Sequence, residues 1–195
     1  MAGNLVLGAL RHVWSILSAS KCPMALMGGL ALATWQRVRA TRDVDILINL
    51  AKTDLHSLLG TLASDGIKPK RQPPIFTLGD LRMVQLEYQA QGVFVPIQID
   101  LLLADSAYHA AALARRVTTR LPDLDIDVSV LTCEDLVLHK LLAGRIVDRA
   151  DVIALLQLNR ATLDLAYLKK WIKDLNLDRD FTEVWKQAFP NENLP

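Results

Sequence analysis

Apolar and polar positions along the first two thirds of the chain predict strands interleaved with helices, beginning with an amphipathic N-terminal helix. Apolar or β-branched runs that predict strands lie at residues 25–27, 43–48, 83–88, 93–103 and 126–131. Helical spacing of apolar residues occurs at residues 30–38, 54–63 and 106–116. A turn at residues 89–92 predicts a hairpin. From residue 132 the pattern is helical throughout, and includes segments 163–175 and 181–188.

Composition limits the class of protein. The chain has 195 residues, of which 51% are hydrophobic, so it can bury a full core as one unit or as a core with a small appendage. Its net charge of +1 gives no overall attraction for polyanions, and a nucleic-acid site would have to be a local patch. Without a signal-peptide pattern or a run of transmembrane length, we expect a cytoplasmic protein. Two cysteines outside any Cys-x-x-Cys pattern and four scattered histidines indicate neither a disulfide framework nor a zinc site.

Asp43 and Asp45 are the first candidates for chemistry. Alternate residues of a strand point to the same face, so the two carboxylates converge while Val44 and Ile46 face the other way. Carboxylates within an apolar run need a compensating charge, and Mg²⁺ binds one or two carboxylates together with substrate phosphates. Gly28 and Gly29 precede this pair and would let backbone N–H groups approach an anion closely.

Each motif has an ordinary explanation when it is taken alone. Asp-x-Asp occurs by chance in many chains, and Gly-Gly often marks only a turn. Their order and spacing favour a joint site, and Asp100 in a second apolar run would complete a cluster of three carboxylates for two metal ions. The alternative for Asp100 is a residue near a strand end that caps the next turn.

The order Gly-Gly, helix, Asp-x-Asp and later Asp resembles the nucleotidyltransferase superfamily of the DNA polymerase β type, over about residues 20–105. Segments 26–31 and 39–45 are similar to the AbiEii-like branch, which includes toxins of type IV toxin–antitoxin systems. The resemblance implies an α+β fold with a mixed sheet flanked by helices. It also implies a nucleotidyltransferase core at residues 1–131 and a helical region at 132–195 that completes the active-site cleft.

Segment 132–145 resembles a helix of that branch in which a lysine faces the nucleotide. Thr132 is a plausible N-cap and Gly144 a plausible C-cap, and at 100° per residue Lys140 falls on an apolar stripe. Phosphate contact is therefore one interpretation, and a packed stem with the ammonium in water is the other. His139 falls on the polar side near Asp135 and is interpreted as a surface residue.

Further charged residues are secondary candidates. In relatives the stretch after Gly144 often carries an acid that supports the lysine or the nucleophile, which makes Asp151 a nucleotide-site candidate. Capping by Asp148, with Asp151 in the first helical turn, explains both acids equally well. Arg42 lies in a segment without acidic residues, and the positive charge of this segment suits a triphosphate or an RNA end. Arginines are also common at a solvated helix C-terminus, which is the alternative. The other basic residues are Arg37 and Arg39 in the same segment, and Lys68, Lys70 and Arg71.

The resemblance implies transfer of a nucleoside monophosphate from an NTP to an acceptor hydroxyl, with release of pyrophosphate. Mg²⁺, or Mn²⁺ in its place, would be held by Asp43, Asp45 and Asp100, and the acceptor would be tRNA or a partner protein. One alternative is a nucleotide- or partner-binding module of a toxin–antitoxin pair, and another is a drug-modifying enzyme. Trp171 and Trp185, at helical spacing, are interpreted as packing residues. The sequence leaves the acceptor, the choice of NTP and the oligomeric state open.

Overall fold

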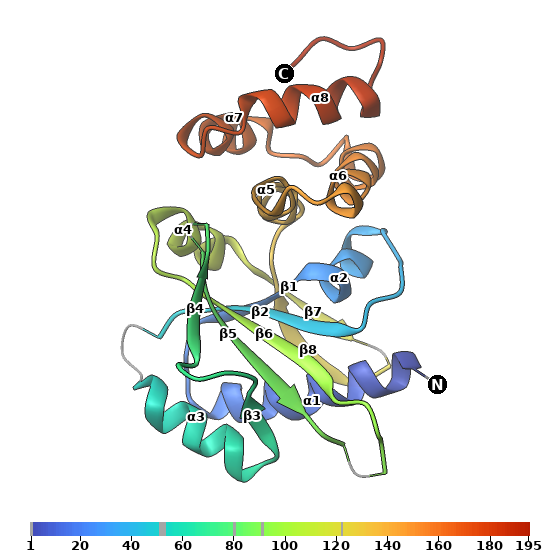
Figure 1. Ribbon diagram of the computed structural model, residues 1–195. Coiled ribbons are helices and arrows are strands. Elements are labelled where there is room, and N and C mark those ends of the chain that lie inside the picture. Colours follow the sequence, from blue (N-terminus) through green and yellow to red (C-terminus); the bar gives the residue numbers. More distant parts are fainter. Residues whose placement is uncertain (1, 51–53, 80, 91, 122) are drawn as a thin grey trace.

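A computed structural model describes residues 2–50, 54–79, 81–90, 92–121 and 123–195 (Figure 1). The described strands form one mixed sheet in the order β3-β5-β6-β2-β1-β8-β7, with β4 paired to β5. They are β1 Met24–Met27, β2 Asp43–Ile48, β3 Ile67–Pro69, β4 Ile75–Leu78, β5 Leu81–Tyr88, β6 Ile97–Leu103, β7 Val117–Leu121 and β8 Ile126–Val130. The helices are α1 Ala2–Ala19, α2 Gly28–Ala31, the 3₁₀ helix η1 Leu32–Trp35, α3 Leu55–Ser64, α4 Ala107–Arg115, α5 Cys133–Ala143, α6 Ile146–Asn159, α7 Leu165–Asp174 and α8 Asp178–Ala188.

The helices form layers on the two sides of the sheet. Helices α1 and α3 lie against one face, and α5 to α8 are stacked beyond the other (Figure 1). The core includes Ile46 and Ile99 from the central strands and Leu10 and Leu17 from α1, all fully buried. Since α1 and α3 cover one face, the polar side chains of the central strands point toward the opposite face, below α5.

Most predicted elements are present, and the fold is α+β with a mixed sheet as expected. Strands β5 and β6 pair antiparallel, which confirms the hairpin, although Gln91 of the predicted turn lies outside the described residues. Thr132 caps α5 by accepting from the Asp135 amide, and Gly144 ends that helix in the left-handed conformation, as predicted. Strands β3, β4 and β7 were not predicted, because they are short and half-exposed and carry no clear alternation.

The helix predicted at residues 30–38 is shorter and begins earlier. It starts at Gly28, tightens to a 3₁₀ turn and ends at Trp35, because Gln36 adopts a left-handed φ of 66°. Residues 37–42 therefore form a connection to β2 without regular secondary structure. The interpretation of Arg37 and Arg39 as residues of a solvated helix end is wrong.

His139 is buried, so its interpretation as a surface residue is also wrong. Helix α5 lies between the sheet and the later helices, and its polar side is covered by neighbouring aromatic side chains rather than by water. The His139 ring stacks on the ring of His109 of α4, with 5.4 Å between ring centres, and its centre lies 5.2 Å from that of Tyr108.

Trp171 and Trp185 are buried packing residues, as predicted. No helix among the described residues could span a membrane.

We expect His139 to make the folded state sensitive to acid. Burial, reinforced by His109, lowers the pKa of His139 to about 3, whereas an exposed histidine titrates near pH 6.5. The unfolded chain binds a proton that the folded chain does not, so this stability is fully present above about pH 6.5 and is lost as the pH falls toward 3.

Chemical denaturation of an His139→Gln variant tests this expectation. Between about pH 7 and pH 4 its free energy of unfolding should fall less than that of the wild type, by up to about 1.4 kcal/mol per pH unit. His56→Gln, at an exposed position of α3, is the control and should follow the wild type. Equal pH dependence in all three proteins would contradict a buried neutral histidine.

Candidate active site

Gly28 and Gly29 are the first two residues of α2, directly after β1, and two side chains approach their backbone closely. Gly28 has a φ of +63°, and a Cβ atom there would lie 1.8 Å from Asp45 Oδ2. A Cβ atom on Gly29 would lie 2.6 Å from Thr41 Oγ1. Both positions therefore require glycine, because a larger residue would overlap the side chain of Asp45 or Thr41. This requirement is independent of any role in binding an anion.

The three aspartates meet as the sequence predicted. Strand β2 pairs in parallel with β6, and the register places Asp45 beside Asp100. One carboxylate oxygen from each of Asp43, Asp45 and Asp100 lies within 4.8 Å of the other two. Thr41 Oγ1 donates a hydrogen bond to Asp43, and Gln98 Nε2 donates to both Asp100 oxygens at 2.9 and 3.1 Å. These contacts orient the outer two carboxylates while Asp45 lies between them.

The cluster has the electrostatic character of a cation site. Burial, and then the charges of Asp43 and Asp100, raise the pKa of Asp45 to about 7. Burial also raises the pKa of Asp100. Among the described residues, no lysine or arginine lies within ion-pair distance of these three carboxylates. Hard oxygen ligands in this number and spacing fit a divalent ion such as Mg²⁺ or Mn²⁺.

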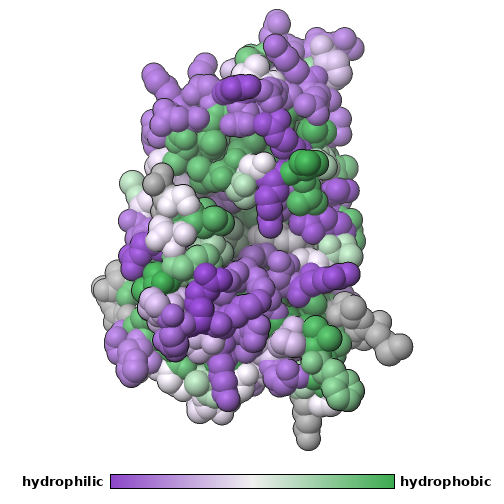
Figure 2. Space-filling model, in the orientation of Figure 1, coloured by the Kyte–Doolittle hydropathy of each residue, from purple (hydrophilic) through white to green (hydrophobic). Residues whose placement is uncertain are grey.

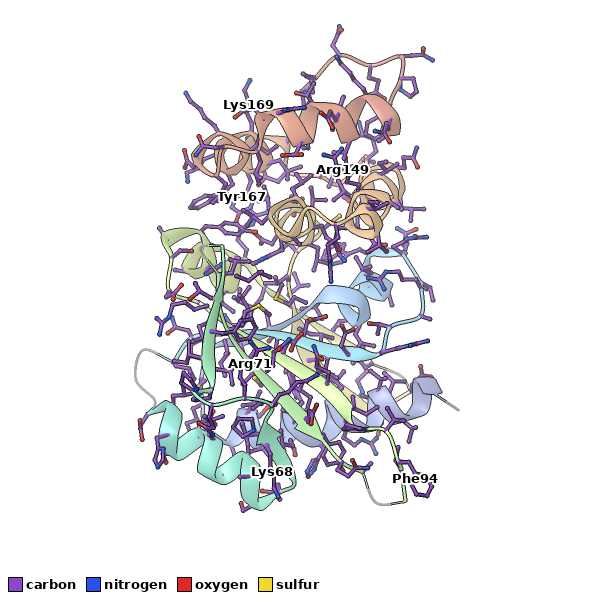
Figure 3. All side chains as sticks on the ribbon, in the orientation of Figure 1. Lys68, Arg71, Phe94, Arg149, Tyr167 and Lys169 are labelled. Carbon is purple, nitrogen blue, oxygen red and sulfur yellow. The ribbon has the colours of Figure 1, made fainter. Side chains whose placement is uncertain are left out.

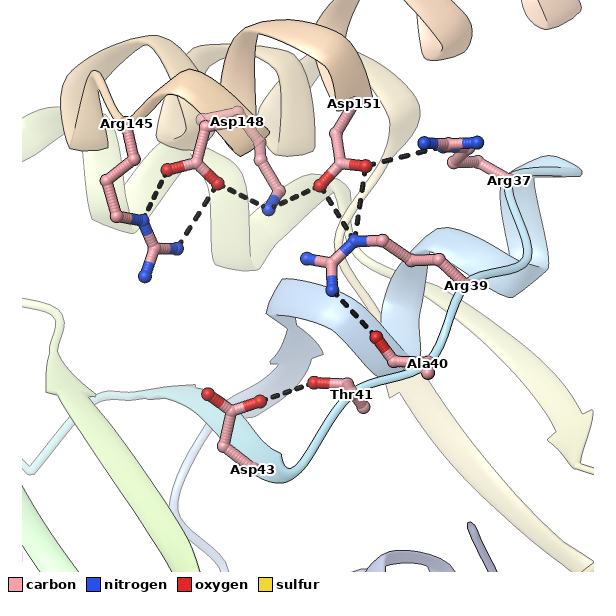
Figure 4. Close-up of polar contacts among 9 residues, drawn as sticks. Arg37, Arg39, Ala40, Thr41, Asp43, Arg145, Asp148 and Asp151 are labelled. Atoms are coloured by element: carbon pink, nitrogen blue, oxygen red, sulfur yellow. Dashed lines mark hydrogen bonds and ion pairs between the residues drawn. The ribbon is translucent and has the colours of Figure 1, made fainter.

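Lys140 is at the centre of a second charged group, which includes Asp148 and Asp151. Figure 4 shows these two aspartates on the far side of the site from Asp43. The Lys140 Nζ atom lies 2.7 Å from Asp148 Oδ1 and 3.0 Å from Asp151 Oδ2, and only 6% of the side chain is exposed. The interpretation in which the Lys140 stem is packed and its ammonium group lies in water is therefore wrong. Helix α6 begins at Ile146 with Arg145 at the N-cap position, so capping by Asp148 is wrong as well, and Asp151 lies beyond the first turn.

Three arginines complete this group. Arg145 Nε lies 2.6 Å from Asp148, while Arg37 Nε and Arg39 Nε lie 3.3 and 3.0 Å from Asp151. Burial alone would raise the pKa of Asp148, but hydrogen bonds from Arg145 and Lys140 outweigh it and lower that pKa. Asp148 and Asp151 are fully buried, and their charges are balanced by cations of the chain.

Two cavities meet at Asp43 and Asp45. The larger, of about 650 Å³, is lined by Asp100, by apolar residues of β4 and β5, and by α5. The smaller, of about 290 Å³, is lined by Gly28, Gly29, Arg39, Thr41 and Arg42. Both cavities are also lined by Lys140 and Arg145. Figure 2 shows a hollow across the middle of the molecule, with apolar side chains above it and hydrophilic ones below.

All predicted site residues except Asp151 line one or both cavities. Asp151 lies behind Lys140 and contacts the site through its ion pairs. Sequence reasoning missed Thr41, Gln98 and Arg145. Thr41 and Gln98 each lie two residues before an aspartate that they bind, and this i to i+2 spacing was a signal that could have found them.

Comparisons with known proteins agree with this geometry. The family model described as nucleotidyl transferase AbiEii toxin, type IV TA system, matches residues 10–194. No curated protein sequence matches.

Among solved structures, the Thermotoga maritima protein TM1012, assigned as a nucleotidyltransferase, is 16% identical, with 89% of this chain and 96% of that chain covered and a TM-score of 0.54. ANT(2")-Ia in complex with adenylyl-2"-tobramycin is 12% identical, with 87% and 97% covered and a TM-score of 0.55. JHP933 from Helicobacter pylori is 17% identical, with 97% and 82% covered and a TM-score of 0.50. At these identities the likeness establishes the fold.

A Gly28→Ala substitution should destabilise the protein. The new Cβ atom would overlap Asp45, and a left-handed φ costs a residue other than glycine about 1–3 kcal/mol. Gly60→Ala in α3 is the matched control, because no described atom lies within 4 Å of the place a Cβ would occupy and alanine favours a helix. Chemical denaturation should show a loss for Gly28→Ala and a small gain for Gly60→Ala. A Gly28→Ala variant as stable as the wild type would contradict the close contact.

Lys140→Met should also destabilise the fold, because it leaves Asp148 and Asp151 buried with fewer positive partners. Breaking a buried ion pair from one side typically costs about 3–5 kcal/mol. The control is Arg179→Met, since Arg179 forms an exposed pair with Glu183 within α8 and its loss should cost less than about 0.5 kcal/mol. Equal, small losses in the free energy of unfolding of the two variants would show that the ion pairs of Lys140 do not stabilise the fold.

Proposed function

The chain belongs to the nucleotidyl transferase AbiEii toxin family of type IV toxin–antitoxin systems, and from this we propose that it transfers a nucleoside monophosphate from an NTP to an acceptor hydroxyl. The acceptor oxygen forms a bond to the α-phosphorus, the bond between the α- and β-phosphates breaks, and pyrophosphate leaves. The observation that supports this reaction is a cluster of three carboxylates, without ion-pair partners among the described residues, two of which line both cavities while the third lines the larger one.

Asp43, Asp45 and Asp100 would hold the divalent ions. When bound, such ions polarise the attacking hydroxyl and neutralise charge on the leaving pyrophosphate. Asp43 and Asp45 line both cavities, whereas Asp100 lines only the larger one. We therefore assign Asp100 to the acceptor side, where its carboxylate can accept the hydroxyl proton.

The smaller cavity would bind the phosphates. Its glycine backbone allows close approach of an anion, and Arg39 and Arg42 supply positive charge. Lys140 and Arg145 line both cavities. In this proposal they stabilise the negative charge that develops on the leaving group. Asp148 and Asp151 hold these cations in position, so that little reorganisation is needed when the substrate binds. In this proposal residues 1–131 carry the metal ligands, and residues 132–195 close the cleft and supply Lys140.

The acceptor distinguishes this proposal from its alternatives. We propose an RNA hydroxyl, with tRNA as the first substrate to test, and a cognate antitoxin as the protein partner, in line with the family. A drug-modifying role has one point in its favour, the fold shared with ANT(2")-Ia, which was solved with adenylyl-2"-tobramycin. A role limited to binding does not require a metal cluster, and for that reason we favour catalysis.

The reaction can be tested with the purified protein, Mg²⁺, each of the four labelled NTPs, and tRNA. Label should pass to tRNA in the wild type, and Asp43→Asn/Asp45→Asn should reduce the rate on the order of a hundredfold or more, because the metal ligands are lost. EDTA should have the same effect.

Asp127→Asn, at an exposed position of β8 away from the cleft, is the control and should keep full activity. Transfer that persists in the double variant would contradict the assigned ligands. No transfer to tRNA or any other acceptor, together with no metal-dependent NTP binding, would contradict the enzymatic proposal.

A further inference from the structure

The sheet ends differently at its two edges. Strand β7 is the last strand in the order, so among the described residues it pairs with β8 on one side and with no strand on the other. The backbone N–H and C=O groups on the outer side of such a strand can pair with another chain. At the opposite edge, β3 has only three residues, carries Lys68 and ends at Pro69, and Figure 3 shows Lys68 on this strand, which lies beside α3. Short length, lysine and proline all oppose strand pairing at that edge.

Strand β7 has none of these protective features. Its five residues, Val-Thr-Thr-Arg-Leu, include neither lysine nor proline, and three of them are β-branched and favour strands. Its one charged side chain, Arg120, pairs with Asp125 and Asp127 of the same hairpin. The side chains of Val117, Thr118 and Arg120 are exposed, so no described element covers them. This edge is therefore accessible to a further strand.

The two faces of β7 differ in character. Thr118 and Arg120 lie on one face, opposite polar residues of β8. Val117, Thr119 and Leu121 lie on the other face, opposite apolar residues of β8, two of which are buried. Residues that lie opposite one another in a sheet share a face. A strand added beside β7 must therefore place polar side chains on the first face and apolar side chains on the second.

A second copy of β7 matches both faces. When two copies run antiparallel about a two-fold axis perpendicular to the sheet, each face of one sheet continues as the same face of the other. With the axis at Thr119, Val117 lies opposite Leu121 of the second copy, and Thr118 lies opposite Arg120 of the second copy. Every residue of the strand is then paired, and no like charges meet. A shift of two residues leaves fewer pairs, and in one direction it opposes the two Arg120 side chains, while a shift of one residue brings the wrong faces together.

We propose that β7 is a self-association site, at which two copies of this chain join their sheets in antiparallel register about Thr119. The self-complementary order of apolar, hydroxyl and charged side chains selects a second copy as the occupant. Since the axis preserves the faces, both clefts open on the same face of the joined sheet. One strand from each copy buries less than the roughly 1,200–2,000 Å² of a stable complex, so the dimer is weak and depends on concentration. This inference does not depend on the proposed reaction.

Sedimentation velocity of the full chain over a range of concentrations tests the charge pattern. Thr118→Glu places an acid opposite Arg120 of the second copy and should tighten the dimer about fivefold, because symmetry creates this pair twice. Thr118→Arg opposes like charges and should weaken the dimer by a similar factor. Thr118 is exposed, so both variants should melt at nearly the wild-type temperature. Thr77→Glu and Thr77→Arg, at an exposed position of β4, are the matched controls and should associate as the wild type does.

Cysteine cross-linking tests the register. In the proposed dimer the two Thr119 residues are directly opposite, with about 4.5–5.5 Å between Cα atoms, which is within the range of about 4.4–6.8 Å found in disulfides. Thr119→Cys should therefore form a disulfide-linked dimer under mild oxidation, as seen on a non-reducing gel. Thr118→Cys is the control, because Thr118 is more exposed but faces Arg120, and it should cross-link little. The native Cys22 and Cys133 are both buried.

The two measurements give clear outcomes. Opposite shifts of the dimer constant in Thr118→Glu and Thr118→Arg, with cross-linking through Thr119→Cys, would support pairing of β7 with its own copy. If the wild type and Thr118→Glu both stay monomeric at every concentration, or if Thr118→Arg dimerises as well as the wild type, β7 is not the site. Cross-linking of Thr118→Cys as efficient as that of Thr119→Cys, or no cross-linking of Thr119→Cys, would overturn the register and with it the proposal.

Discussion

Two groups of carboxylates face each other across the cleft, one fully buried and one partly buried, and the chain supplies close cationic partners only to the fully buried group. Asp148 and Asp151 are balanced by Lys140 and by arginines at 2.6–3.3 Å. Asp43, Asp45 and Asp100 are crowded on adjacent strands, and the pKa of Asp45 is raised to about 7. Charges removed from water must be paired or must bind metal. The imbalance between the two groups therefore underlies both the ion-pair network on one side of the cleft and the metal binding that we propose on the other.

The architecture serves this division of charge. The sheet supplies carboxylates from two adjacent strands. Because α1 and α3 cover the other face of these strands, the acidic side chains lie on the face that borders the cleft. Helices α5 and α6 supply Lys140 and its two aspartates, and the connection at residues 37–42 supplies arginines to the same network. Asp151 thus joins segments more than a hundred residues apart, and holds the connection at residues 37–42 against the helical region.

The parts of the fold and site that follow from local pattern were predictable. Alternation along β2 places Asp43 and Asp45 on one face, and the caps at Thr132 and Gly144 depend only on local backbone geometry. That Asp100 lies beside them depends on the pairing of β2 with β6, which only the family resemblance indicated. The surroundings of α5 were not predictable, because a helical wheel distinguishes a polar side from an apolar side but does not show that α4 covers the polar one. His139 was misassigned for this reason. The partners of Lys140 were similarly hidden, since they depend on how α6 packs on α5 and on the early end of η1.

The proposed reaction requires phosphates in the smaller cavity and divalent metal ions that Asp43, Asp45 and Asp100 would hold. Crystals grown with Mn²⁺ and a non-hydrolysable ATP analogue would locate both, the metal through its anomalous signal. We expect anomalous peaks within coordination distance of Asp43, Asp45 and Asp100, with the triphosphate beside Gly28, Gly29 and Arg42. Phosphates bound elsewhere, or Mn²⁺ absent from the carboxylates while the nucleotide is bound, would contradict this arrangement.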